Sequence, residues 1–490
     1  MKIDKYELDK DQMNIVTSND NYILVVAGAG SGKTLTILGK IKYLVEIGYK
    51  EDEILCISFT KASSSELENK IKTILNCNIN VFTFHKLAIN ILKSEGVNKE
   101  ICDMDLLNNV IHKYLHIDIL NYKKQIKYIM KIIGKRFFLV KNYKKYLNNK
   151  KIGVLEKNIA TFIRLMKCNG YDLVYINELL KKRNSRKYKY FLLITLSCYL
   201  LYEEELSNNN EYDFDDLIIN AKNIINNKKY MNYKYIIVDE YQDTSYIRFS
   251  LIKKIIDNNS AKLMVVGDDF QSIYRFTGCN IELFTNFGKY FSNASIMYIT
   301  NTYRNSQELV NIAGGFVMKN KYQIKKRLIS VKRLDNPVII VYYKNIIKAV
   351  EKIINNYNNV MIIGRNNKDV NMIIDNITFK YINNKIVYLK NNSITVDYLT
   401  VHKSKGLEAD NVIVINNIDD ILGFPSKLKD DIVLKDIISE EEFPYSEERR
   451  LFYVALTRTK NYVFLLCPYN NRSIFIKEIE KNKSILKKRM

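Results

Sequence analysis

Short apolar runs bounded by turn residues recur along the chain in two series. The runs are Ile23–Val26, Ile54–Phe59, Ile236–Val238 and Leu263–Val266, then Ile296–Ile299, Val338–Tyr342, Met361–Ile363, Val412–Ile415 and Val463–Leu466. Runs of this kind are typical of parallel strands that are buried on both faces and alternate with helices. The pattern therefore predicts an α/β chain with two doubly wound units, each a parallel sheet flanked by helices.

A different pattern fills the segment from about residue 86 to 207. It contains no proline and few glycines, and its apolar residues fall at helical spacing, as do Leu192, Leu196 and Tyr199. This spacing predicts a helical insertion in the first unit. We therefore expect a discontinuous first unit (1–85 and 208–284), a helical insertion (86–207) and a second unit (285–490).

The composition excludes several classes of protein. The chain has 490 residues, of which 47% are hydrophobic, so it can form several packed cores. No stretch approaches the roughly 18 apolar residues of a membrane span, and the charged N-terminus does not resemble a secretory signal. Seven scattered cysteines without a C-x-x-C pair argue against a disulfide framework and against a structural zinc or iron–sulfur site. We expect a soluble, cytoplasmic protein without a membrane partner.

The formal net charge is +23, which suits a polyanionic partner because each neutralised phosphate releases a counterion. The alternative explanation is codon bias, since Lys, Ile, Asn and Tyr are abundant throughout and Trp is absent. Charge alone therefore supports, but does not establish, binding to nucleic acid.

A phosphate-binding loop follows the first apolar run. The run Ile23–Val26 leads into Ala27, Gly28, Ala29, Gly30, Ser31, Gly32, Lys33 and Thr34, and a helical stretch begins at Leu35. In this strand–loop–helix context, backbone N–H groups face the phosphates of ATP, Lys33 reaches the β and γ oxygens, and the Thr34 hydroxyl binds Mg²⁺.

A pair of adjacent carboxylates follows a second predicted strand. Asp239 and Glu240 come directly after Ile236–Val238. Ligands of open α/β sheets bind at the carboxyl ends of the strands, so Asp239 is placed to hold Mg²⁺ and Glu240 to orient or deprotonate the attacking water.

Five further sequence blocks identify a family. They are Val238–Ser245 (VDEYQDTS), Val266–Phe276 (VGDDFQSIYRF), Thr302–Ser306 (TYRNS), Thr400–Glu408 (TVHKSKGLE) and Glu447–Arg458 (EERRLFYVALTR). In wording and order they resemble motifs II to VI of the UvrD/Rep-type superfamily 1 DNA helicases, most closely helicase IV. The resemblance spans residues 12–458. It implies two RecA-like P-loop domains, 1A and 2A, with a helical 1B insertion in the first.

The resemblance also implies roles for individual residues. Gln12 and Tyr303 are expected to hold the adenine, Gln271 to sense the γ-phosphate, and Glu408 to lie near the ribose. Arg304 and Arg458 are expected to project from the second unit onto the triphosphate, where charge develops in the transition state.

For the nucleic-acid strand, the candidates are Phe59, Thr83, His85, Phe276, Thr400 and His402. Exposed aromatic rings can stack on bases of any sequence, although Phe59 and Phe276 are alternatively core residues. Two departures from the family affect this surface: Lys61-Ala62-Ser63-Ser64 replaces the common motif Ia wording, and Thr277 stands where arginine is frequent. His112 and His116 lie four residues apart without an accompanying Glu or Cys, so we expect them to be incidental.

Family members usually insert an accessory 2B domain before motif V. Here the segment Met361–Asn366 matches the strand that precedes the 2B insertion. Only about 33 residues lie between Asn366 and Thr400, which is too few for a domain. The sequence therefore predicts that 2B is absent, and no extension precedes Gln12. We expect a 3′→5′ translocase or helicase on single-stranded DNA or tailed duplex. The alternatives are the motor subunit of a nuclease, repair or defence complex, and a protein-remodelling ATPase that acts on transcription machinery.

Overall fold

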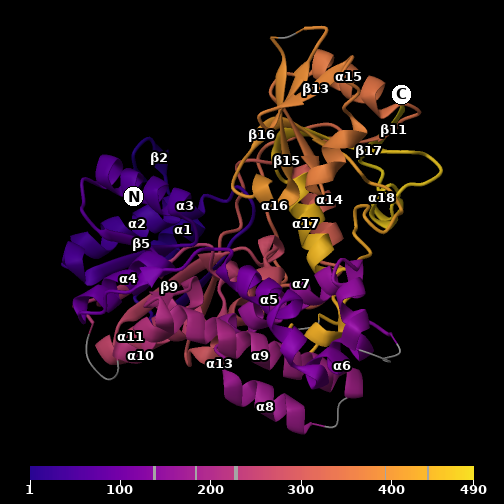
Figure 1. Cartoon of the computed structure of the whole chain (residues 1–490). Helices are drawn as coiled ribbons and strands as arrows, with labels where there is room; N and C mark the ends of the chain where they lie inside the picture. The colour runs from indigo at the N-terminus through magenta and orange to yellow at the C-terminus, as the bar shows by residue number, and fades with distance from the viewer. Residues whose placement is uncertain (136–139, 183–184, 226–229, 392, 439–440) are drawn as a thin grey trace.

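The computed structural model describes residues 1–135, 140–182, 185–225, 230–391, 393–438 and 441–490, so parts of the predicted insertion, 136–139 and 183–184, lie outside the described residues. Figure 1 shows a first sheet unit at the left, indigo in its N-terminal part and pink where the chain returns to it, a group of purple and magenta helices at the bottom, and a second sheet unit in orange and yellow at the upper right. In the described part of the chain, no helix is both long and apolar enough to cross a membrane.

The first sheet is parallel throughout and has the order β10-β3-β9-β8-β4-β5. Its strands are β3 (Tyr22–Val26), β4 (Ile54–Ser58), β5 (Asn80–Thr83), β8 (Tyr235–Val238), β9 (Lys262–Gly267) and β10 (Ser295–Tyr298). Successive side chains of a strand point to opposite faces. Leu24 and Val26 accordingly join the core on one face, and Ile23 and Val25 join the core on the other.

Helices cover both faces of this sheet. One face packs against α1 (Lys10–Thr17), α2 (Lys33–Glu46) and α3 (Lys61–Lys70). The other packs against α4 (Phe84–Ser94), α10 (Phe214–Ile225), α11 (Tyr246–Asn259), α12 (Glu282–Thr285) and α13 (Phe287–Tyr290). Two short pairs of strands, β1 (Lys2–Ile3) with β2 (Tyr6–Glu7) and β6 (Glu100–Ile101) with β7 (Glu211–Tyr212), lie outside the sheet.

The second sheet has the order β13-β14-β15-β12-β16-β17-β11-β18. Its strands pair in parallel, except that β14 is antiparallel to both of its neighbours, β13 and β15. Its strands are β11 (Val338–Tyr342), β12 (Val360–Gly364), β13 (Phe379–Ile382), β14 (Lys385–Tyr388), β15 (Thr395–Thr400), β16 (Ala409–Val414), β17 (Thr459–Cys467) and β18 (Ile485–Arg489). The flanking helices are α14 (Gln307–Val317), α15 (Ile346–Asn356), α16 (Val401–Ser404), α17 (Ser446–Leu456) and α18 (Ile474–Ile479). Together the two sheets confirm the predicted fold class of two parallel-sheet units flanked by helices.

The described helices of the insertion form a separate hydrophobic core. They are α5 (Leu106–His116), α6 (Lys123–Ile132), α7 (Lys150–Cys168), α8 (Leu173–Lys181) and α9 (Arg186–Asn208). Phe162 on α7 and Phe191 on α9 meet edge to face in this core, with ring centroids 5.7 Å apart. The helical spacing seen around Leu192 thus predicted α9 correctly.

A segment of the second unit also enters the core of the insertion. Val433, Leu434 and Ile437, in and after the 3₁₀ turn Ile432–Leu434, are only 5–6% exposed and pack among the insertion helices. Tyr175 donates a hydrogen bond of 2.5 Å to the backbone carbonyl of Asp436, and Asn169 donates one of 3.1 Å to that of Ile437. The second unit therefore contacts the insertion as well as the first unit.

Two details of the predicted organisation are wrong. The run Ile296–Ile299 does not begin the second series, because β10 pairs with β3 in the first sheet. The predicted boundary between residues 284 and 285 therefore assigns this strand to the wrong unit. Helix α4 packs on the first sheet rather than in the insertion, whose core begins at Cys102. Apolar runs identify strands and helices, but the sheet that each joins depends on contacts distant in sequence.

The residues between β12 and β15 form a 3₁₀ segment, Asn367–Met372, and the hairpin of β13 and β14. The absence of a 2B domain remains a prediction.

Candidate functional site

The predicted phosphate loop connects β3 to the first turn of α2, and two of its glycines adopt positive φ angles, 71° at Gly30 and 81° at Gly32. A Cβ at Gly30 would lie 2.4 Å from the Cβ of Arg304, and a Cβ at Gly32 would lie 2.8 Å from Nε2 of Gln12. Both positions combine a left-handed backbone with a close neighbour, so a side chain is excluded there. The loop is thus fixed tightly between the N-terminal segment and the chain that follows β10.

The chain after β10 binds backbone carbonyls of the phosphate loop. The Thr302 hydroxyl donates to the carbonyl of Ala29 over 2.7 Å, and the N–H of Tyr303 donates to the carbonyl of Gly30 over 2.9 Å. These bonds place the Tyr303 ring beside the loop. The ring is 57% exposed, and its hydroxyl donates to Asp9 over 2.8 Å.

Gln12 lies behind the loop rather than in the open cleft. It is fully buried, accepts a hydrogen bond from the N–H of Asp9, and donates one of 3.3 Å to the carbonyl of Ser31. The capping box that Asp9 and Gln12 form at the start of α1 explains why the local sequence places it here.

Asp239 and Glu240 lie where β8 ends, facing the start of α2. Oε1 of Glu240 lies 3.5 Å from Nζ of Lys33, and the backbone of Glu240 is left-handed, with a φ of 50°. Burial, and then the charge of Glu240, raises the pKa of the Asp239 carboxyl. Burial also acts to raise the pKa of Glu240, but Lys33 and Lys405 outweigh it and lower that pKa. Glu240 is therefore ionised, whereas neighbouring cations only weakly balance a negative charge on Asp239.

Lys405 of the second unit joins this cluster across the cleft. It forms an ion pair with Asp243, lies 3.9 Å from Oε2 of Glu240, and donates a 2.8 Å hydrogen bond to the backbone carbonyl of Gln271. Its side chain is only 9% exposed. Lys405 was not among the predicted site residues, although its place in the TVHKSKGLE block was a usable signal.

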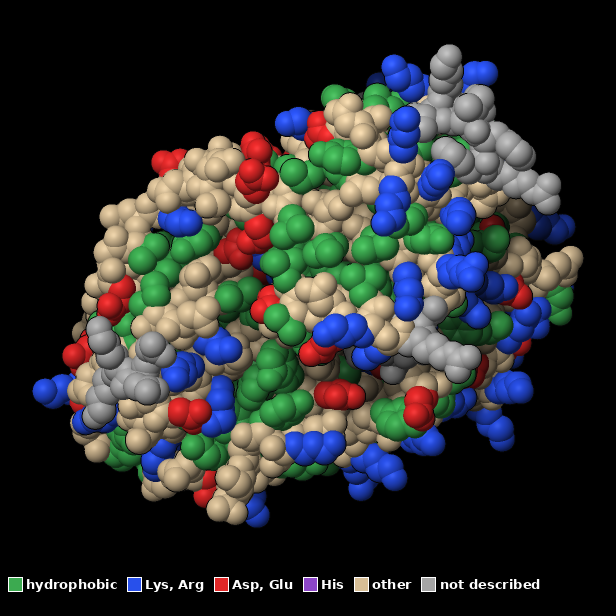
Figure 2. All heavy atoms as spheres, turned by 60° about the horizontal axis from the view of Figure 1, so that its bottom comes forward, with side chains coloured by type: hydrophobic (Ala, Val, Ile, Leu, Met, Phe, Trp, Pro, Cys, Tyr) green, Lys and Arg blue, Asp and Glu red, His purple; other side chains and the backbone are tan. Residues whose placement is uncertain are grey.

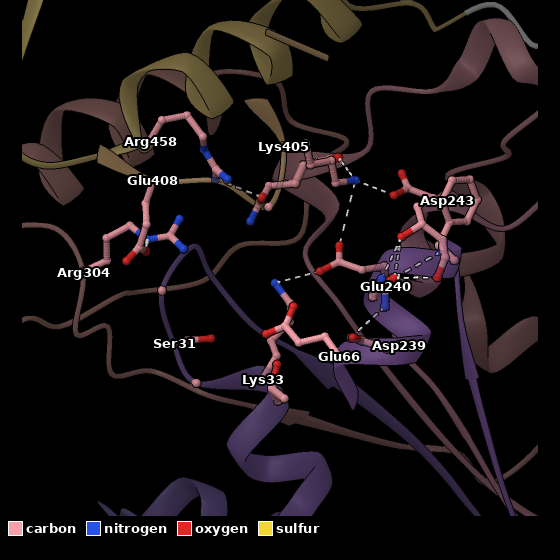
Figure 3. Close-up of a pocket in the computed structure, with 18 of the residues that line it drawn as sticks. Ser31, Lys33, Glu66, Asp239, Glu240, Asp243, Arg304, Lys405, Glu408 and Arg458 are labelled. Carbon is pink, nitrogen blue, oxygen red and sulfur yellow. Dashed lines mark hydrogen bonds and ion pairs between the residues drawn. The ribbon is translucent and has the colours of Figure 1, made fainter. Parts of the chain in front are cut away.

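The two predicted arginines approach from the second unit (Figure 3). Arg458 is 1% exposed and donates from Nη2 to Oε1 of Gln271 over 3.1 Å. Burial and the neighbouring Arg304 lower its pKa to about 10, so it stays charged at neutral pH. Arg304 lies 2.7 Å from a carboxylate oxygen of Glu408, whose other oxygen lies 3.2 Å from Lys460. In this state Glu408 thus pairs with cations.

The amide nitrogen of Gln271, whose oxygen accepts from Arg458, is hydrogen-bonded as well. Its Nε2 donates to Oδ2 of Asp268 over 2.6 Å, and Oδ1 of Asp268 pairs with Nζ of Lys326. Lys326 in turn donates to the carbonyl of Ala27, where the phosphate loop begins, over 2.9 Å. A continuous chain of polar contacts therefore runs from the phosphate loop through Lys326, Asp268 and Gln271 to Arg458.

These groups surround a cleft of about 590 Å³ between the two units. Most of the predicted nucleotide-site residues line it: Gly30, Ser31, Gly32, Lys33, Thr34, Asp239, Glu240, Gln271, Tyr303, Arg304, Glu408 and Arg458. Gln12, Ala27, Gly28 and Ala29 do not line it. Residues that the sequence reasoning missed also line it: Thr60, Ser63, Glu66, Asp243, Tyr274, Lys332, Lys405, Gly406 and Lys460.

A strip of aromatic side chains continues from one edge of this cleft. Phe59 and Tyr274 stack with centroids 5.9 Å apart, and Phe276 meets His402 edge to face at 5.4 Å. The Arg248 guanidinium lies 4.9 Å from the Phe59 ring centroid. Phe276 is 57% exposed, and neither Phe59 nor Phe276 belongs to a described core cluster, so the core alternative is wrong for both. Tyr274 and Arg248 were missed.

The four remaining candidates occupy equivalent places in the two units. Thr83 ends β5 and caps α4, and Thr400 ends β15 and caps α16. A histidine follows each threonine by two residues. Burial, followed by the charge of Arg248 or Arg365 respectively, lowers the pKa of both His85 and His402 to about 4. Both imidazoles are therefore neutral at pH 7 and can donate hydrogen bonds or stack, but they do not neutralise phosphates.

The surface around the insertion is rich in cations. Figure 2 shows the molecule tilted so that the bottom of Figure 1 faces the reader. Many Lys and Arg side chains lie on this face, with fewer Asp and Glu between them. This distribution agrees with the net charge of +23.

A phosphate loop and paired carboxylates in one parallel-sheet unit, faced by arginines from a second unit, define the class of P-loop ATPases with a composite site. A model of the UvrD/REP helicase N-terminal domain matches residues 8–292, which is more than half of the chain. The chain belongs to the UvrD/REP helicase family and is an ATP-dependent enzyme of that family. A model of the viral superfamily 1 RNA helicase core domain also matches residues 220–467.

Individual relatives agree with this assignment. DNA helicase IV of Escherichia coli (strain K12) is 28% identical over 98% of this chain and 71% of its own length. A probable DNA helicase of Mycoplasma pneumoniae is 26% identical over 97% of this chain and 87% of its own length. A probable DNA helicase II homolog of Mycoplasma capricolum is 31% identical over 68% of this chain, and the match spans only 44% of that relative.

Proposed function

We propose that the chain couples ATP hydrolysis to 3′→5′ movement along single-stranded DNA and separates duplex ahead of it. The observation that carries this proposal is the composite cleft, in which Lys33 and Glu240 of the first unit face Arg304 and Arg458 of the second. Hydrolysis at such a site requires the two units to approach, which converts the nucleotide state into relative movement.

Each lining residue has a role in this proposal. The phosphate loop and Lys33 hold the β and γ phosphates, Glu240 orients the attacking water, and Gln271 contacts the γ-phosphate. Arg304 and Arg458 stabilise the charge that develops on the transferred phosphoryl group. The face of Tyr303 supports the adenine, Gln12 exchanges its hydrogen bond to Ser31 for the base, and Glu408 exchanges its contact with Arg304 for the ribose.

Mg²⁺ fits the residues present at the end of β8. Asp239 is a partly buried carboxyl whose neighbour Glu240 is also acidic, and this arrangement raises its pKa, so a divalent cation would relieve the repulsion. Asp239 and the Thr34 hydroxyl supply the hard oxygen ligands that Mg²⁺ prefers. When bound, Mg²⁺ neutralises phosphate charge, while Lys33 and the loop N–H groups orient the triphosphate.

The strand of DNA follows the aromatic strip in this proposal. Phe276, which is 57% exposed, offers its ring to a base beside the stacked pair of Phe59 and Tyr274, while Thr83 and Thr400 stand at equivalent positions in the two units. Stacking is indifferent to sequence, so we expect no sequence preference. A cytoplasmic location, and a nuclease or repair partner, remain predictions.

The direct test is ATP turnover measured alone and with single-stranded DNA, single-stranded RNA and blunt duplex. We expect strong stimulation by single-stranded DNA. Equal stimulation by RNA would show that the chain acts on RNA as well as on DNA. No stimulation by any nucleic acid would favour a protein-remodelling ATPase. Displacement of streptavidin from biotin at the 3′ or 5′ end then gives the direction, with faster release from the 5′ end expected for 3′→5′ movement.

A further inference from the structure

Two histidines and a glutamate meet on the outside of the helical insertion, away from the ATP cleft. His112 and His116 lie on α5, and Glu156 lies on the neighbouring helix α7. Nδ1 of His112 and Nε2 of His116 lie 2.9 and 3.0 Å from the same oxygen, Oε1 of Glu156. The two imidazole rings stack with centroids 4.0 Å apart. The sequence suggested that no acidic residue accompanies these histidines, and the packing of α5 on α7 corrects that expectation.

We propose that His112, His116 and Glu156 bind a divalent first-row transition metal ion, with Zn²⁺ as the ion that fits best. One ligand atom from each residue lies within 4.8 Å of the other two. Zinc binds His nitrogen and Glu oxygen at about 2.0–2.2 Å with tetrahedral geometry, which sets ligand atoms roughly 3.3 Å apart. The two histidine nitrogens lie 2.9 and 3.0 Å from Oε1 of Glu156, so these distances need to lengthen only slightly to admit the ion.

The chemistry of the three ligands sets the selectivity. Imidazole suits zinc, copper and nickel, whereas Mg²⁺ and Ca²⁺ prefer sites made entirely of oxygen ligands. The His112 side chain is 63% exposed, and those of His116 and Glu156 are 18% and 26% exposed. An ion held by these three residues therefore keeps a coordination position open to water.

A bound ion would link α5 to α7 within the insertion. None of the three residues lines the ATP cleft, so the proposal is independent of the helicase assignment. An ion that binds the folded chain preferentially raises the unfolding temperature as its concentration rises.

The test is titration of the full chain with Zn²⁺ and Co²⁺ in the presence of a non-chelating reductant. The variants are His112→Gln, His116→Gln and Glu156→Gln, and Lys113→Gln is the matched control, because Lys113 is an exposed residue between the two histidines. We expect one ion per chain in wild type and control, and at least tenfold weaker binding in each ligand variant. The unfolding temperature should rise with Zn²⁺ in wild type and control only.

Glu156→Gln preserves the size of the side chain and an acceptor for the imidazole N–H groups. Similar unfolding temperatures of this variant and wild type without metal would exclude a folding defect. The Co²⁺ spectrum should lack the intense near-ultraviolet bands of thiolate ligands. Unchanged affinity in His116→Gln and Glu156→Gln, thiolate bands, equally tight binding of Mg²⁺, or no binding to wild type would each overturn the proposal.

Discussion

Lys326 and Asp268 form an ion pair that is closed to solvent: Nζ lies 2.5 Å from Oδ1, and the two side chains are 2% and 0% exposed. The Lys326 ammonium also lies 2.7 Å from Asp269. Burial acts to lower the pKa of Lys326, but the two carboxylates outweigh it and raise that pKa. Because Asp268 also holds Gln271, this pair connects the phosphate loop with the residue that faces Arg458.

Lys326→Met is expected to destabilise the fold and to slow ATP turnover. Removing one partner leaves two buried carboxylates without a cation, which typically costs about 3–5 kcal/mol. In chains that remain folded, Gln271 loses its fixed support, so kcat should fall more than the affinity for ATP. Urea unfolding and steady-state ATPase assays measure the two effects.

The matched control is Lys325→Met, because Lys325 is the exposed neighbour of Lys326. It should leave stability and turnover near the wild-type values. If Lys326→Met were as stable and active as this control, the buried pair would have neither role.

Lys33→Ala is expected to abolish ATP hydrolysis while single-stranded DNA still binds. Lys33 lies at the start of α2, 3.5 Å from Glu240, and it lines the cleft. The aromatic strip does not depend on it. ATPase assays and fluorescence anisotropy with labelled DNA measure the two properties, and retained turnover would place the nucleotide site elsewhere.

Phe276→Ala is expected to weaken binding to single-stranded DNA without changing its salt dependence. Loss of one stacked base costs about 1–3 kcal/mol, and a ring carries no charge. The slope of log affinity against log salt should stay at about −0.7 per phosphate contacted. Tyr6→Ala, at another exposed aromatic residue, is the control. Equal affinities of the two variants would remove Phe276 from the DNA path.

Asp215→Asn is expected to become more stable relative to wild type as the pH rises from about 4 to about 7. Burial, and then the charge of Asp213, raises the pKa of Asp215 from 3.8 to about 6. A carboxyl with a raised pKa stabilises the fold while protonated and loses that contribution as the pH passes through 6. The relative gain should reach roughly 3 kcal/mol in the free energy of unfolding.

Urea unfolding at a series of pH values measures this difference. Asp257→Asn, at an exposed aspartate on α11, is the control and should show little change across the same range. A pH-independent difference between Asp215→Asn and wild type would show that Asp215 ionises in the folded chain as freely as in the unfolded chain.

The local elements around the predicted nucleotide site were easier to predict than the division into units. The residues from Gly30 to Thr34 and the pair Asp239 and Glu240 lie on or beside elements whose patterns are local. Their places follow from a strand, a turn and a helix. The sheet that β10 joins does not follow from its own pattern, because a parallel strand pairs with distant segments.

Contacts that depend on distant packing were missed for the same reason. Lys326 looks like one more cation in a lysine-rich chain, and only the folded structure places it beside Asp268. Val433 and Leu434 likewise show no pattern that predicts their burial in the insertion. Glu156 meets His116, which lies 40 residues earlier in the chain, through the packing of two helices.

The central claim is that one ATP site is shared between the two units, and ATP turnover of Arg458→Ala with saturating single-stranded DNA tests it most directly. Arginines that act across a cleft typically contribute about 10³–10⁵ in turnover. We therefore predict a loss on that scale, with Mg-ATP affinity kept within roughly an order of magnitude. Arg304→Ala should behave similarly, and the double variant should be little worse than either. Turnover near the wild-type rate in either single variant would contradict the shared site.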